Sequence, residues 1–174
     1  VEPTRELMSC PLQPVANDKY VELQYPENDI EWRGNQVETV DDIARGFNYA
    51  RSQDPSVFQF LIMPDQATWD AMSLQDKGLY LVNAERTARG LKPYQGVAQE
   101  IVTIAQGYAD YIHDRNQVIG HYNDGLSPSD RLDSNAYLAS HRDAHVKTES
   151  LASGNGYAEV PTVDQALVLA IYGW

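Results

Sequence analysis

Apolar residues recur at the spacing of one helix face in several parts of the chain. The clearest pattern lies in residues 97–115, where successive apolar positions are separated by 4, 3, 4 and 4 residues. This spacing predicts a helix with one buried stripe. The stripe comprises Val97, Ile101, Ile104, Tyr108 and Ile112. Other repeats predict helices over about residues 40–53, 73–89 and 128–139, with a single turn near Thr68.

Helix-start motifs support these assignments. An N-cap side chain accepts a hydrogen bond from the first turn, and an acid or amide three residues later completes a capping box. The expected N-caps are Thr39, Ser73, Ser127 and Thr162. Gly90 is a good residue to follow the helix over residues 73–89, because glycine tolerates the left-handed conformation that often follows a helix.

The last predicted helix starts after Thr162 and runs to the end of the chain. Its expected apolar face comprises Val163, Ala166, Leu167, Ala170, Ile171 and Trp174. No stop signal follows this face. We therefore expect a truncation, a proteolytic cut or further residues beyond Trp174.

Few segments resemble strands. The apolar run from Val57 to Met63, closed by Pro64, predicts a strand or a packed extended segment. Residues 1–35 hold four prolines and show no sustained period, which predicts an arm or a linker. Helices should therefore dominate the fold.

Charge limits the possible partners. The chain carries a net charge of −12, which argues against binding to nucleic acid or to anionic lipid surfaces, because such binding needs clustered Lys and Arg. No apolar run approaches the roughly 20 residues that a membrane-spanning helix needs. The single cysteine, Cys10, excludes an intrachain disulfide and leaves a free thiol or a bond to another chain.

The stretch from His121 to Glu149 holds the candidate chemistry. His121 and Tyr122 precede an Asp124-Gly125 turn, and Glu149 opens a later turn. Imidazole and carboxylate are common ligands of zinc and similar divalent cations, so these two residues predict half of a metal site. The alternative is that His121 is a solvated loop residue and that Glu149 caps a turn through the helix dipole.

Residues 79–174 resemble the CAP superfamily of cysteine-rich secretory, antigen-five and pathogenesis-related proteins, in particular its bacterial extracellular, SCP-like members. The resemblance rests on pieces in a fixed order along the chain. These are the Asn83–Arg86 pair, Leu91–Tyr94, Ile104–Ala109, His121 with Asp124, Gly125 and Arg131, Glu149–Gly154, and Trp174.

This resemblance implies an α+β fold, an α-β-α sandwich with a small antiparallel sheet. It implies an N-terminal extension over residues 1–63, with one helix and an extended arm, and a CAP domain over residues 64–174 that lacks its C-terminal part. His121 and Glu149 match the first His and first Glu of the family's cleft, and Tyr122 would line it. A C-terminal continuation or a second polypeptide would supply the missing ligands and strands.

The resemblance also leads to three functional hypotheses. The leading one is a secreted, extracellular or periplasmic module whose cleft binds a small molecule, a lipid-like ligand or a divalent cation without established catalysis. The second is a metal-dependent hydrolase, perhaps a protease, that uses His121 and Glu149. The third is a structural subunit of an extracellular assembly. Whether the protein is an enzyme stays open at this point.

Overall fold

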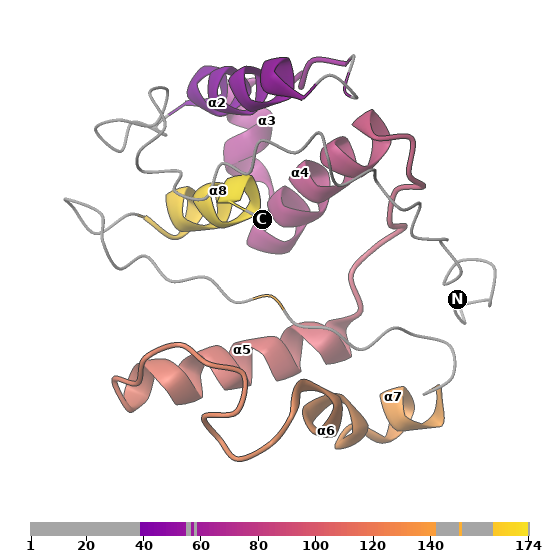
Figure 1. Cartoon of the computed structure of the whole chain (residues 1–174), viewed down its shortest axis with the longest axis vertical. Coiled ribbons are helices and arrows are strands. Elements are labelled where there is room, and N and C mark those ends of the chain that lie inside the picture. The colour runs from indigo at the N-terminus through magenta and orange to yellow at the C-terminus, as the bar shows by residue number, and fades with distance from the viewer. Residues whose placement is uncertain (1–38, 55–56, 58, 142–149, 151–161, 174) are drawn as a thin grey trace. The chain divides into compact units, whose positions relative to one another are not determined.

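The computed structural model describes residues 39–54, 57, 59–141, 150 and 162–173. Its helices group into two compact units (Figure 1). One unit contains α2 (Val40–Gln53), α3 (Gln66–Ala71), α4 (Leu74–Ala88) and α8 (Val163–Gly173). The other contains α5 (Gln99–Asp114), α6 (Pro128–Asp133) and α7 (Ala136–Ser140).

The helix starts of the α2/α3/α4/α8 unit agree with the capping motifs. The hydroxyls of Thr39, Ser73 and Thr162 each accept a hydrogen bond from the N–H three residues further on. Helix α4 ends with Gly90 at φ +72°, and the Leu91 N–H donates to the Arg86 carbonyl. The predicted bounds of these helices are confirmed to within one or two residues.

The core of this unit draws on all four helices and on the segment before α3. Leu81 of α4 is fully buried, and Val168 of α8 is 1% exposed. The buried core cluster comprises Ile43, Phe47, Leu61, Trp69, Leu81, Val168, Leu169 and Ile171. Helix α8 packs against α4 (Figure 1). The predicted boundary between residues 63 and 64 falls inside this unit, since α2 shares a core with α3 and α4.

The predicted apolar face of α8 is only partly the face that packs: Ile171 belongs to the core and Leu167 packs against it, but the buried face also includes residues outside the prediction. Val163, predicted on the apolar face, is 68% exposed, whereas Val168 and Leu169 are buried. The helix is apolar on nearly every side, so periodicity could not identify the packed face. Trp174 lies outside the described residues.

Two buried cationic side chains form ion pairs between helices of this unit. The Lys77 ammonium pairs with Asp164 of α8 and lies 5.4 Å from the centre of the Trp69 ring. The Arg51 guanidinium donates to Glu85 of α4 at 2.6 and 3.0 Å. Both cations are less than one-tenth exposed, so each depends on its carboxylate.

Few described side chains of the α5/α6/α7 unit are buried: these are Tyr108, Arg131 and Leu138. Ser127 and Asp130 form the predicted capping box at the start of α6. The single helix expected over residues 128–139 is wrong in one respect, because it divides into α6 and α7. Asn135 causes the division by acting as a second N-cap, accepting from the N–H groups of Tyr137 and Leu138.

The predicted buried stripe of α5 is only partly buried. Tyr108 is 4% exposed, Ile104 and Ile112 are half-buried, and Val97 and Ile101 are 47% and 44% exposed. Within its own unit, α5 packs on the short helix α6, which is too short to cover its full length.

The prediction of an α+β, α-β-α sandwich is wrong for the part of the chain that the structure describes, which contains helices and no strand. The described residues of the apolar run before Pro64, Val57 and residues 59–63, form neither a helix nor a strand. The Leu61 main chain of this run instead bonds to the side-chain amide of Asn48 on α2. A side-chain amide thus supplies the donor and acceptor that a second strand would have provided. Among the described helices, none is long and apolar enough to cross a bilayer.

Candidate functional site

The chain reverses direction after α5 and returns along it as loop 118–126, which contains the predicted site residues. Asn116 adopts φ 48°, and the Gln117 N–H donates to the Ile112 carbonyl at 3.1 Å. This is the hydrogen-bond pattern of a left-handed helix ending. The reversal brings the loop against Tyr108 and Tyr111 of α5.

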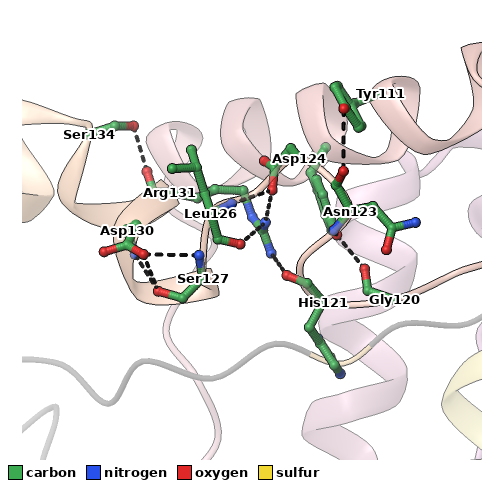
Figure 2. A network of polar contacts seen from close by, with 11 residues as sticks. Tyr111, Gly120, His121, Asn123, Asp124, Leu126, Ser127, Asp130, Arg131 and Ser134 are labelled. Atoms are coloured by element: carbon green, nitrogen blue, oxygen red, sulfur yellow. Dashed lines mark hydrogen bonds and ion pairs between the residues drawn. The ribbon is translucent and has the colours of Figure 1, made fainter.

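Arg131 of α6 reaches into this loop, with its guanidinium among Asp124, Leu126 and His121 (Figure 2). Its Nη1 donates to the Asp124 carboxylate at 2.8 Å and to the Leu126 carbonyl at 3.0 Å. Its Nη2 donates to the His121 carbonyl at 3.0 Å. Arg131 is 5% exposed, so these acceptors replace the water that the guanidinium loses on folding.

Tyr108 supports the same loop from α5. The Arg131 guanidinium lies 3.5 Å from the centre of the Tyr108 ring, a cation–π distance. The Tyr108 hydroxyl donates to the Gly120 carbonyl and accepts from the Asn123 N–H at 3.1 Å. One buried tyrosine therefore binds both the loop and the arginine that organises it.

Local bonds fix the rest of the loop. The Asn123 amide donates to the Val118 carbonyl at 2.7 Å, and the Tyr111 hydroxyl donates to the Asn123 carbonyl at 3.3 Å. A Cβ atom at Gly120 would lie 2.6 Å from Asn123 Oδ1, so a side chain there would displace this amide. Gly125 has φ +81°, a conformation that few residues other than glycine adopt readily.

Two of the three predicted site residues, His121 and Tyr122, are exposed on the loop. The His121 main chain is bound to Arg131, while its exposed imidazole points away from the guanidinium (Figure 2). Tyr122 is 67% exposed. Glu149 lies outside the described residues, so the structure does not test whether it lies near His121.

The metal-site prediction stays a prediction. Among the residues whose positions are described, no group of three or more His, Cys, Asp or Glu side chains is arranged to hold a metal ion. A bound zinc ion needs three or four protein ligands. Within loop 118–126 the nearest carboxylate in sequence, Asp124, is already paired with Arg131.

The loop presents apolar side chains that sequence reasoning did not single out. Val118 is 88% exposed and Leu126 is 43% exposed, on either side of Tyr122. The sequence carried no signal for their exposure, because single exposed apolar residues are common on protein surfaces. With Tyr122, the loop therefore has three exposed apolar or aromatic side chains.

Comparisons with known proteins give this chain no relative. No family model, no curated protein and no solved structure matches it.

Proposed function

We propose that the protein is an interaction module without catalytic activity, which binds a partner protein through loop 118–126. The observation that carries this proposal is the buried Arg131, which binds three acceptors spread over the loop. A loop held in one conformation loses little entropy on binding, so more of its contact energy is available as affinity.

The exposed side chains of the loop suit this role. Tyr122 combines a large ring with a hydroxyl and has few rotatable bonds, and tyrosine is enriched among the residues that dominate interface energies. Val118 and Leu126 add exposed apolar area on the same loop. The Asp124 charge is compensated by Arg131, so the loop offers a locally neutral surface on a chain of net charge −12. We expect the partner to present an apolar pocket that receives the Tyr122 ring.

The other hypotheses remain predictions. The described part of the chain does not test a cation site at His121 and Glu149 or a hydrolase built on that site. It also does not test a small-molecule or lipid-like ligand, a second polypeptide that completes the fold, or a secreted or periplasmic location. The loop argument requires none of them.

The experiment has two stages. A photoreactive benzoylphenylalanine replaces Tyr122, and crosslinked proteins from the native cells are identified and purified. The dissociation constant of the purified partner is then measured with the unmodified chain and with variants. Tyr122→Ala should weaken binding by about tenfold or more. Tyr137→Ala is the matched control, since Tyr137 is also exposed in the same unit but lies on α7.

A second variant separates support from contact. Arg131→Met replaces none of the exposed side chains of the loop, so a weaker affinity for this variant indicates that the loop conformation contributes to binding. Unchanged affinity for a triple variant of Val118, Tyr122 and Leu126 to alanine would refute the proposal. A dissociation constant that rises in the presence of a metal chelator, and likewise on His121→Ala, would favour the metal-site hypothesis instead.

A further inference from the structure

The α2/α3/α4/α8 unit contains an open groove of about 500 Å³ beside the extended segment before α3. Phe60, Leu61 and Ile62 form one wall of this groove. The exposed side of α4 forms another, through Leu79, Asn83 and Thr87. The groove lies wholly within this unit and is separate from loop 118–126.

Burial alternates over residues 60–62, as it does along an extended chain. Leu61 is 4% exposed, whereas Phe60 and Ile62 are 71% and 80% exposed. The hydrogen bonds alternate in the same way. Asn48 binds both main-chain groups of Leu61, and Arg51 donates to the Gln59 carbonyl at 2.8 Å. Residues 59 and 61 thus direct their polar main-chain groups toward α2.

The main-chain groups of the intervening residues point to the opposite edge, because successive residues of an extended chain face alternate sides. On that edge the Tyr80 hydroxyl of α4 donates to the Ile62 carbonyl. Within the described residues, no hydrogen bond involves the N–H or the carbonyl of Phe60 or the N–H of Ile62. The edge that borders the groove therefore offers, in order along the chain, the Phe60 N–H as a donor, the Phe60 carbonyl as an acceptor and the Ile62 N–H as a second donor.

An extended peptide is the occupant that this edge fits. A peptide laid beside an open strand edge pairs with its main-chain groups, and pockets for alternate side chains give specificity. Neither a compact ligand nor a helix matches donors and acceptors spaced along an extended chain. The Phe60 and Ile62 side chains and Leu79 would contact apolar side chains at every second position of the peptide.

Charge adds a second preference. Arg51 lines the groove but is buried and already paired with Glu85. Asp76, an exposed carboxylate at the start of α4, is the other charged residue of the lining. With a net charge of −12 on the chain, the groove should favour peptides that carry lysine or arginine.

We infer that this groove binds an extended peptide segment with alternating apolar side chains and basic ends, paired through its main chain to Phe60 and Ile62. This inference does not depend on the function proposed for loop 118–126. The two surfaces lie in different units and use different residues.

The test uses the full chain and a fluorescein-labelled peptide of sequence KVTVTVK. Fluorescence anisotropy should show saturable binding of this peptide. Binding should be at least about tenfold weaker for EVTVTVE, which reverses the end charges, and for KVTPTVK, in which proline removes a main-chain donor. The absence of saturation up to about 1 mM KVTVTVK overturns the inference, as does equal affinity for the proline peptide.

Variants of the protein isolate the main-chain contribution. Phe60→Ala keeps the main-chain N–H and loses the ring, whereas Phe60→Pro loses both. Phe60→Pro should bind at least about fivefold more weakly than Phe60→Ala. Equal affinity of the two variants would overturn the pairing.

Two further variants test the groove without changing the extended segment and distinguish it from loop 118–126. Thr87→Trp, on the opposite wall, should block the groove without touching the extended segment, and preserved binding would contradict the inference. Tyr122→Ala should leave peptide affinity unchanged, and a loss there would place the peptide on loop 118–126 rather than in the groove. Circular dichroism of each variant checks that its helices are intact.

Discussion

The guanidinium of Arg131 lies 3.5 Å from the centre of the Tyr108 ring while it also binds three acceptors of the neighbouring loop. Each partner stabilises the buried cation in a different way. The ring covers one face, Asp124 compensates the charge, and the two carbonyls complete the hydrogen bonds. The conformation of loop 118–126 and the burial of this charge therefore depend on each other.

Replacing Arg131 by methionine should destabilise the α5/α6/α7 unit by about 3 kcal/mol, because the Asp124 carboxylate loses its cation in a partly buried position. Hydrogen exchange of the amides in residues 121–126 measures the effect locally. Arg115→Met is the control, since Arg115 also stacks on a tyrosine, at 3.9 Å from the Tyr111 ring, but is exposed. Its cost should stay below about 0.5 kcal/mol. Similar protection factors for the two variants would contradict the role given to Arg131.

The Tyr108 hydroxyl gives a second test. Tyr108→Phe keeps the ring under Arg131 but removes the donor to Gly120 and the acceptor for the Asn123 N–H. We expect a loss of about 1–2 kcal/mol, seen most clearly as faster exchange of the Asn123 amide. Tyr111→Phe removes a single, longer bond of 3.3 Å and should cost less. The reverse order of the two costs would show that the hydroxyl of Tyr108 is not the main anchor.

The sequence predicted best what local chemistry decides. The caps at Thr39, Ser73, Ser127 and Thr162 act within one helical turn, so their residue types were sufficient. Asn135 was missed although its chemistry is equally local, because the apolar pattern continued across it. A side chain that competes for main-chain hydrogen bonds can end a helix that periodicity alone would extend.

Burial was predicted less well, because it depends on what packs against each face. Ile101 and Tyr108 lie on the same predicted stripe of α5, yet only Tyr108 is buried, since it alone lies under loop 118–126 and Arg131. The position of Arg131 in a loop motif was noticed in the sequence. The burial of Arg131 could not be predicted, because the acceptors that make burial possible include main-chain carbonyls that only the fold brings together.

The Lys77–Asp164 pair should respond unequally to the loss of either partner. The Lys77 side chain is 6% exposed, whereas the Asp164 side chain is 46% exposed. Asp164→Ala leaves a buried ammonium without its anion and should cost about 2–4 kcal/mol. Lys77→Met removes the buried charge, retains most of the volume beside Trp69, and leaves a carboxylate that water can reach. It should cost less than about 1 kcal/mol. Urea unfolding of both variants gives the comparison, and equal costs would contradict the asymmetry.

Asp65 should make the start of α3 sensitive to acid. Its carboxylate accepts from the Thr68 N–H and hydroxyl, both at 2.9 Å, and the N–H bond is the main reason that the pKa of Asp65 lies below its ordinary value. A carboxyl whose pKa is lower in the folded state stabilises the fold above its unfolded pKa of about 3.9. That contribution is lost as the pH falls through the folded pKa.

Asparagine at this position keeps the capping acceptor but has no charge to titrate. The stability of the parent chain relative to Asp65→Asn should therefore be constant above about pH 5 and should fall as the pH is lowered below about 4. Urea unfolding of both proteins at a series of pH values measures this difference, and a carboxyl NMR titration of Asp65 measures the pKa directly. Parallel stability curves down to the acid limit, or an Asp65 that titrates at the ordinary value, would show that the cap does not depend on the charge.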